Sequence, residues 1–263
     1  MPDDNSRLLE VSGLRISVPG RVLVESLDMT LARGEFIAVL GRNGTGKTLS
    51  LLTLAGLRPP DGGTVRLGGA AIGSLRRQQV AKRLALLPQD TDDIFPATVL
   101  DTALVGRHPH IGRFRWESPQ DYELARVSLA QVGMEELSGR DVLSLSGGER
   151  RRLAIAQILT QLPEIYLLDE PTNHLDPQHQ VDTLHIFRQA ADNGAGVIAS
   201  LHDVNLAARV ADRCLLLFGD GRWEFGTTDE VLDEERLGAL FQTPMEAVSW
   251  RDRRLFVAGG ERR

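Results

Sequence analysis

The 263-residue chain has one cysteine and few lysines. Cys214 has no possible disulfide partner within the chain and lies in an apolar stretch, so we expect a buried core residue in a reducing compartment. Only Lys47 and Lys82 among the 30 basic residues are lysines. The six histidines show no metal-ligand spacing with a cysteine, and we therefore predict no zinc site.

Long apolar runs and a strong positive charge are missing too. No stretch approaches the roughly 18 to 20 apolar residues that a membrane-spanning helix needs, and residues 1–9 do not form a secretory signal. The net charge of −6 gives no general case for nucleic-acid binding. The local run 107–116 is basic with aromatic residues; a nucleic-acid patch is one interpretation, and we favour a loop near a partner surface.

A glycine-rich motif follows a short apolar run. Residues 36–40 are typical of a strand buried in a parallel sheet, and residues 41–48 (GRNGTGKT) match the phosphate loop G-x-x-x-x-G-K-[ST] in full. A helical pattern follows, which is the context that this motif requires. Backbone N–H groups would cradle phosphates, Lys47 would reach the β and γ phosphates, and the Thr48 hydroxyl would bind Mg²⁺. The predicted nucleotide contacts in this loop are Gly41, Arg42, Asn43, Gly44, Thr45, Gly46, Lys47 and Thr48.

Polar residues end three further apolar runs. Asp169 and Glu170 follow residues 165–168, Gln89 follows 84–88, and His202 follows 197–201. The carboxyl edge of an open α/β sheet is where ligands bind. We expect Asp169 and Gln89 to serve Mg²⁺, the former through water, and Glu170 to activate the attacking water as a catalytic residue with His202 and Gln89.

These motifs stand in the order of an ATP-binding cassette (ABC) transporter, and the chain resembles its nucleotide-binding subunit over about residues 8–230. The motifs are the phosphate loop, Gln89, residues 145–149 (LSGGE), Asp169–Glu170, residues 173–176 (NHLD) and His202. The resemblance implies a homodimer in which Ser146, Gly147 and Gly148 bind, in trans, the ATP held by the partner's phosphate loop. Their helix, expected over about 149–161, would offer its positive end to the γ-phosphate. Asp176 would lie at the dimer seam.

The family's architecture implies an α/β fold: a phosphate-loop NTPase core with a mixed, mainly parallel sheet, an antiparallel N-terminal β subdomain and an inserted helical lobe. The expected divisions are 1–89 with 165–240 for the ATP-binding core, 90–164 for the lobe and 241–263 for a C-terminal tail with a small hairpin. In the lobe, Ser118 to Asp121 predict a capping box, followed by an apolar face at Leu124, Val127, Ala130 and Val132.

Two positions depart from the family pattern. An aromatic residue that stacks on adenine is usual near Val18, but none occurs before Phe36. Base contacts would come from aliphatic side chains or Arg21, which weakens the expected preference for ATP over GTP. Leu49 stands where a second hydroxyl is common, and we expect somewhat weaker nucleotide binding.

The resemblance implies an ATPase that drives transport. Chain length and the stretches 105–107 and 169–176 resemble subunits that import metal chelates: ferric siderophores, cobalamin or haem. Such a subunit would bind permease subunits at the cytoplasmic face of the inner membrane, with a periplasmic substrate-binding protein and no nucleic acid as partner. Coupling would run through the loop after Gln89, especially Phe95, Pro96 and Val99.

Other functions stay open. An exporter or lipid-trafficking ATPase carries nearly the same motifs. A non-transport ATPase of the DNA-repair or chromosome-organising kind is disfavoured because the interval from Thr48 to Leu145 is short and lacks heptads. Translation-associated members usually hold two cassettes, and this chain has one. A catalytically silent cassette is disfavoured because Lys47, Asp169, Glu170 and His202 are all present.

Overall fold

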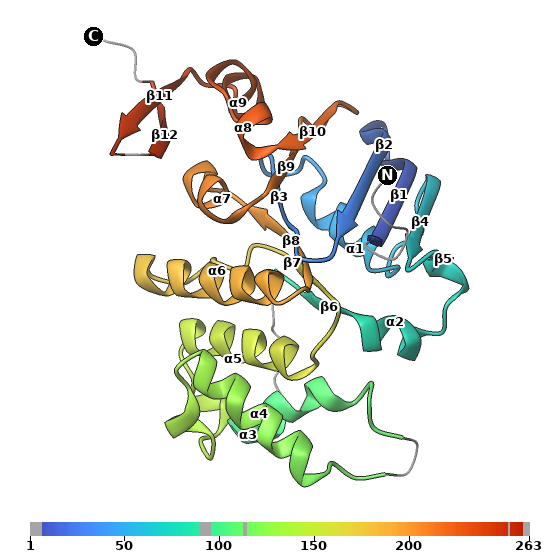
Figure 1. Ribbon diagram of the computed structural model, residues 1–263, viewed down its shortest axis with the longest axis vertical. Helices are drawn as coiled ribbons and strands as arrows, with labels where there is room; N and C mark the ends of the chain where they lie inside the picture. The colour runs from blue at the N-terminus through green and yellow to red at the C-terminus, as the bar shows by residue number, and fades with distance from the viewer. Residues whose placement is uncertain (1–6, 90–95, 113–114, 252, 260–263) are drawn as a thin grey trace.

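A six-stranded sheet lies at the centre of the computed structural model, which describes residues 7–89, 96–112, 115–251 and 253–259 (Figure 1). The strand order is β10-β9-β3-β8-β7-β6; β10 is antiparallel and the other strands are parallel. The predicted mixed, mainly parallel sheet is therefore confirmed. Its strands are β3 (Phe36–Leu40), β6 (Leu84–Leu87), β7 (Ile165–Leu168), β8 (Gly196–Leu201), β9 (Arg213–Leu217) and β10 (Trp223–Thr227).

A second, antiparallel sheet is built mainly from the amino-terminal part of the chain, in the order β2-β1-β4-β5. A turn at Pro19 and Gly20 joins two long strands, and Gly20 adopts a φ of 79°. The antiparallel N-terminal sheet is confirmed, and two later strands extend it. The strands are β1 (Arg7–Val18), β2 (Arg21–Ala32), β4 (Gly62–Leu67) and β5 (Ala70–Ala71).

The central sheet divides the interior into two cores, because both of its faces are covered. In β3, Phe36, Ala38 and Leu40 belong to one core and Ile37 and Val39 to the other, as the two-residue period of a strand requires. The first core continues into the helical lobe, and the second packs against the antiparallel sheet and α1. This two-sided burial explains why the strands read as continuous apolar runs.

Nine α-helices are present in the described part of the chain, and three of them, α3, α4 and α5, form the lobe at the bottom of Figure 1. The helix expected over about 149–161 begins at Gly147, inside the LSGGE motif and two residues earlier than expected. The helices are α1 (Lys47–Leu54), α2 (Arg77–Arg83), α3 (Val99–Leu104), α4 (Pro119–Gln131), α5 (Gly147–Thr160), α6 (Pro177–Asp192), α7 (Val204–Val210), α8 (Thr228–Val231) and α9 (Glu234–Phe241). None of the described helices combines the length and the apolar character needed to cross a membrane.

Helix α4 begins at the predicted capping box, but its predicted apolar face is only partly correct, because Val132 is buried while Val127 and Ala130 are not. Ser118 and Asp121 exchange the expected hydrogen bonds. The buried stripe consists of Ala125, Ser128, Leu129 and Val132, whereas Val127 is half exposed and Ala130 is exposed. The stripe is rotated because Ser128, which looks polar in the sequence, satisfies its hydroxyl on the Leu124 carbonyl oxygen within the helix at 2.9 Å and can be buried.

The predicted terminal hairpin is present: β11 (Met245–Trp250) pairs with β12 (Arg253–Ala258). One side chain of α7 makes two hydrogen bonds to this hairpin. Asn205 donates from Nδ2 to the Phe256 carbonyl oxygen at 3.0 Å, and its Oδ1 accepts from the Phe256 N–H at 2.8 Å. The Phe256 ring is buried beside α7. The chain also turns back between β9 and β10, with Gly219 and Gly221 at positive φ.

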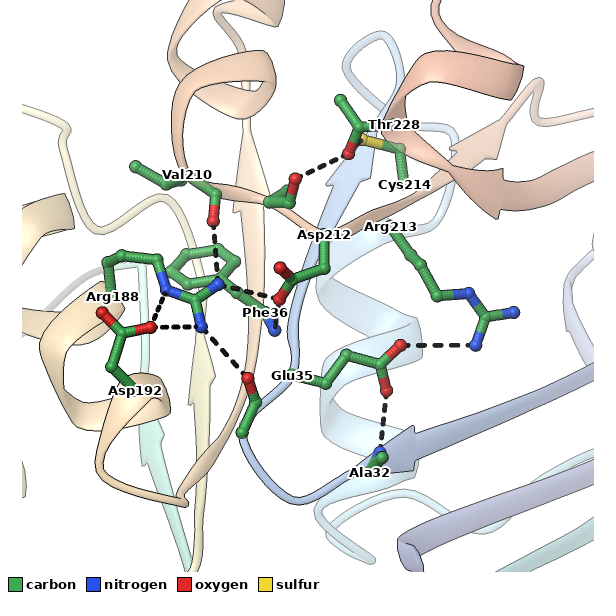
Figure 2. A network of polar contacts seen from close by, with 12 residues as sticks. Ala32, Glu35, Phe36, Arg188, Asp192, Val210, Asp212, Arg213, Cys214 and Thr228 are labelled. Atoms are coloured by element: carbon green, nitrogen blue, oxygen red, sulfur yellow. Dashed lines mark hydrogen bonds and ion pairs between the residues drawn. The ribbon is translucent and has the colours of Figure 1, made fainter. Parts of the chain in front are cut away.

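Arginine 188 joins three elements at the amino-terminal edge of the central sheet (Figure 2). From α6 it donates to Asp212 Oδ2 at 2.8 Å and to the carbonyl oxygens of Val210 and Gly34. Asp212 Oδ2 also accepts from the Phe36 N–H at the start of β3. These bonds hold α6 against the starts of β3 and β9, opposite the strand ends that carry the predicted site.

The lone cysteine lies next to this network, where Cys214 is fully buried in β9. Burial raises the pKa of its thiol to about 11, so it stays protonated at neutral pH. It is a free thiol, and the prediction of a buried core residue is confirmed.

Candidate functional site

The loop after β3 needs its glycines for conformation and for space. Gly44 and Gly46 adopt φ values of 76° and 104°, which side-chain-bearing residues rarely adopt. A Cβ atom added to Gly41 would lie 2.5 Å from Thr45 Oγ1 and 2.7 Å from the Leu217 carbonyl oxygen. Glycines are therefore required at these positions for the loop to adopt its conformation just before α1.

Lys47 points back into the loop from the first turn of α1. Its side chain is buried, and Nζ donates to the Gly41 carbonyl oxygen at 2.8 Å. Burial lowers the pKa of Lys47, while the carboxylates of Glu170 and Asp169 act in the opposite direction. The ammonium is therefore held close to both acids in a poorly solvated position, where a phosphate would interact with it strongly.

Asp169 and Glu170 follow β7, and a serine on the neighbouring strand holds them both. Ser200, on β8, donates from Oγ to Asp169 Oδ1 at 2.6 Å and accepts from the Glu170 N–H at 2.9 Å. All three residues are buried. The sequence analysis missed Ser200, whose signal is a hydroxyl inside an otherwise apolar strand, two residues before His202.

The Glu170 carboxylate is fixed by two further side chains. His202 Nε2 lies 2.5 Å from Oε1, and the Asn173 amide donates to Oε2. Glu170 has a φ of 49°, so its backbone departs from the strand and its side chain leaves the direction of Asp169. The two adjacent acids thus occupy different environments, which suits different roles.

A cavity of about 580 Å³ brings most of the predicted residues together. Lys47, Thr48, Gln89, Glu170 and His202 all line it. Gly44, Gly46 and Asn43 do so as well, while Asp169 is buried behind the wall with Ser200. A larger groove of about 840 Å³ between α4 and α6 includes none of the predicted site residues.

The far end of the same cavity bears on nucleobase contacts. Val18 and Arg21, the residues expected near a nucleobase, both line it, and their contact with a base stays a prediction. Arg21 Nη2 donates to the Gly44 carbonyl oxygen at 2.5 Å, which ties the β1–β2 turn to the phosphate loop.

The residues of the LSGGE motif do not line this cavity. Ser146 caps α5 by accepting from the Glu149 N–H, and Glu149 Oε2 accepts in return from the Ser146 N–H at 2.8 Å. These bonds lower the pKa of the Glu149 carboxyl. Ser146 and Gly147 are exposed, so the positive end of α5 is open to a ligand held outside this chain.

Two other predicted features fall elsewhere. Of the proposed coupling residues, Phe95 lies outside the described residues and Val99 is fully buried at the start of α3, so Val99 is not a surface contact. In the run 107–116, Arg107 bonds to Asp121 at 2.8 Å within the lobe. That arginine is therefore part of the lobe's structure, in line with the preferred reading of the run as a lobe loop.

The oxygen atoms near Lys47 suit Mg²⁺. Thr48 contributes a hydroxyl and Gln89 an amide oxygen at the cavity wall, and Asp169 a carboxylate behind it. No cluster of three histidine, cysteine or acidic ligands occurs among the described residues. Hard oxygen donors in small number fit an ion that keeps several waters.

Comparisons with known proteins agree with this geometry. The family described as "ABC transporter" matches residues 24–173. The hemin import ATP-binding protein of Deinococcus radiodurans is 44% identical over 81% of this chain and 82% of its own length. The cobalamin import ATP-binding protein of Halobacterium salinarum is 37% identical over 89% of this chain, which spans only 58% of that relative.

A solved structure gives the same picture. A chain of an inward-facing transporter, assigned to the metal-chelate type of ABC transporters, superposes with a TM-score of 0.84 at 29% identity, over 97% of this chain and 98% of that one. The family match, the relatives and this likeness confirm the recognised family and the fold class. The family match over more than half of the chain and the similarity to these relatives show that the chain belongs to the ABC transporter family.

Proposed function

We propose that the chain is the ATP-hydrolysing subunit of an importer and that two copies act as a head-to-tail homodimer. One observation carries the proposal: Lys47, Gln89, Glu170 and His202 line one cavity, while the exposed tip of α5 at Ser146 does not. The cavity holds the phosphate loop but not the N-terminus of α5, which would be a second anion site and lies elsewhere on the same chain. Dimerisation in head-to-tail fashion would join the two.

Within the cavity the residues divide the work. The loop N–H groups and Lys47 bind the β and γ phosphates, with the ammonium compensating charge that develops on them. Glu170 orients the attacking water and accepts its proton. His202 holds the Glu170 carboxylate and is placed to hydrogen-bond the γ-phosphate. Mg²⁺, held by Thr48 and Gln89 and through water by Asp169, would neutralise phosphate charge.

The partner's α5 would close the site. Its Ser146 hydroxyl and the N–H groups of Gly147 and Gly148 would bind the γ-phosphate at the positive end of the helix. Asp176 caps α6 with an N–H···O bond from His179 at 3.0 Å, and we place this exposed cap at the dimer seam. Hydrolysis removes the shared anion, so the two copies separate.

The chain's partners would be permease subunits in the inner membrane, which it binds from the cytoplasmic face, with a periplasmic substrate-binding protein delivering cargo. The names of the hemin and cobalamin relatives support a metal chelate, such as haem, cobalamin or a ferric siderophore, as that cargo. The expected lobe, 90–164, would receive the permease, with the ATP-binding core at 1–89 and 165–240 and the tail at 241–263.

Hydrolysis and dimerisation are tested on the purified chain. Wild type should hydrolyse ATP in the presence of Mg²⁺, and the Glu170→Gln variant should elute as an ATP-dependent dimer in size-exclusion chromatography. Lys47→Ala is the control that should neither dimerise nor hydrolyse. A chain that stays monomeric and inert, even beside its permease, contradicts the proposal.

The direction of transport and the cargo need the membrane complex. The chain is co-purified with the permease encoded beside it and reconstituted in lipid vesicles with the binding protein. Loading that protein with haem, cobalamin or a ferric siderophore should stimulate ATPase activity and move one of these chelates in the import direction. Stimulation by a lipid or a drug without a binding protein would favour an exporter instead.

A further inference from the structure

One arginine of α5 forms hydrogen bonds with backbone carbonyl groups just after β6 and just after β7. Arg151 lies in the second turn of α5 and is 4% exposed. Its Nη2 donates to the carbonyl oxygens of Asp169 and Glu170, at 2.7 and 2.8 Å. Its Nη1 donates to those of Pro88 and Gln89, at 2.6 and 3.2 Å. A single guanidinium therefore joins α5, the end of β6 and the end of β7.

Only arginine can make this set of contacts. Its planar guanidinium presents five N–H donors in a fixed fork, whereas lysine offers one small ammonium on a flexible stem. The carbonyl groups just beyond the ends of β6 and β7 have left the sheet ladder and need partners when buried. Arg151 supplies those partners on two neighbouring strands at once, and Nε also reaches the Pro171 carbonyl oxygen at 3.5 Å.

These contacts act on the residue that handles water. Glu170 has a left-handed backbone with a φ of 49°, which is costly for a side chain of this size. Ser200 holds its N–H and Arg151 holds its carbonyl oxygen, at 2.9 and 2.8 Å. With both sides of this backbone unit fixed, the carboxylate can be held toward His202.

The same helix begins at the exposed cap formed by Ser146. We propose that Arg151 is a positioning residue that couples the tip of α5 to Glu170 and Gln89 of its own chain. This inference rests on the proposed function, in which the tip of α5 binds the nucleotide of the partner. Occupancy of one site then sets the backbone geometry of the other, so that the two sites of a dimer hydrolyse ATP cooperatively.

The test compares two neighbouring substitutions in the full chain. Arg151→Lys removes most of the fork, while Arg152→Lys is the matched control, because Arg152 makes one bond to the Val132 carbonyl oxygen inside the lobe. Each variant is assayed for ATPase activity against ATP concentration, for binding of a fluorescent ATP analogue and for melting temperature. The assay is run alone and with the permease.

We expect Arg151→Lys to lower kcat by about tenfold or more and to bring the Hill coefficient from near two toward one, with nucleotide affinity changed by less than about threefold. Arg152→Lys should resemble wild type. A purely structural role would lower melting temperature and affinity together and leave the Hill coefficient of the remaining folded protein unchanged.

Three outcomes separate the two proposals. Wild-type protein that neither binds nor hydrolyses ATP overturns the proposed function itself. Active wild type with an Arg151→Lys variant of equal kcat and Hill coefficient overturns the coupling role alone. Because the lysine variant could unfold, Arg151→Gln is measured beside it, and failure of both to fold also overturns the coupling role in favour of a structural one.

Discussion

The imidazole of His202 and the carboxylate of Glu170 meet across the ends of two neighbouring strands, with Nε2 2.5 Å from Oε1. His202 directly follows β8 and Glu170 is the second residue after β7, so the parallel register of the two strands brings the side chains together. The contact fixes a carboxylate that is 7% exposed, at the wall of the cavity that Lys47 also lines. The contact with His202 therefore fixes the orientation of the Glu170 carboxylate, and a fixed orientation is what the proposed role as general base toward water needs.

The first prediction concerns that acid. Glu170→Gln should keep its hydrogen-bonding shape but lose its basicity, and we expect kcat to fall by about a hundredfold or more. Steady-state ATPase assays measure this. The control is Glu164→Gln, at the opposite end of the same strand, which should hydrolyse ATP normally. Near wild-type turnover in the first variant removes Glu170 from its role.

The second prediction concerns the buried serine behind the site. Ser200→Ala leaves Asp169 Oδ1 and the Glu170 N–H without this partner, and we expect a loss of about 1 to 3 kcal/mol in the free energy of unfolding. We also expect a severalfold higher Mg²⁺ concentration for half-maximal ATPase activity, because Asp169 is no longer held. Chemical denaturation and Mg²⁺ titration are the measurements.

Ser50 provides the matched control. It is equally buried, but its Oγ has no hydrogen-bond partner among the described residues. Ser50→Ala should therefore be neutral or stabilising and leave the Mg²⁺ titration unchanged. Equal effects of the two substitutions would show that the contacts of Ser200 carry no special energy.

The third prediction is a pH dependence in the helical lobe. The Arg107 guanidinium beside Asp121 lowers the pKa of that carboxyl from 3.8 to about 2. A lowered folded-state pKa means that the pair stabilises the fold above pH 4 and that this contribution disappears as the pH falls toward 2. A difference of this size corresponds to about 2 kcal/mol, and the Asp121 side chain is only 14% exposed.

Asp121→Asn should thus destabilise the protein by about 2 kcal/mol at pH 7, with the gap to wild type closing between pH 4 and 2. Denaturant unfolding across that pH range measures it. Asp101→Asn is the control, since Asp101 makes a similar cap with Thr98 in α3 but is exposed. A gap that stays constant down to pH 2 contradicts the attribution to the Arg107 pair.

The fourth prediction separates stability from activity. Arg188→Ala removes three bonds that join α6 to the segments leading into β3 and β9, and we expect a loss of about 2 to 4 kcal/mol in the free energy of unfolding. Below the melting temperature, kcat should stay within about twofold, because the network lies at the sheet edge opposite the cavity. Arg222→Ala, whose pair with Asp220 is exposed to solvent, should leave the free energy of unfolding nearly unchanged.

Much of the fold and of the candidate site could be predicted, because the polar residues of the site directly follow apolar runs that form the strands of the central sheet. Each apolar run ended in a residue of distinctive type, and parallel strands bring their carboxyl ends to one edge. The same logic placed Lys47, Gln89, Glu170 and His202, all of which line one cavity. Two-sided burial made the strands visible as apolar runs.

The remaining features depend on contacts that sequence spacing does not encode. In the sequence, Ser200 is one polar residue within an apolar strand, and only the fold places its hydroxyl beside Asp169 and Glu170. Arg151 is the middle of three consecutive arginines, and only the fold brings its guanidinium to the ends of β6 and β7. The apolar face of α4 was misjudged because Ser128 satisfies its own hydroxyl inside the helix. Pattern counts treat such a serine as exposed.

The two hydrogen bonds between the Asn205 side chain and the Phe256 backbone connect the terminal hairpin to α7. Asn205 lies in the opening turn of α7, three positions beyond His202. A displacement of the β11–β12 hairpin would therefore act first on the opening turn of α7, which begins two residues after His202.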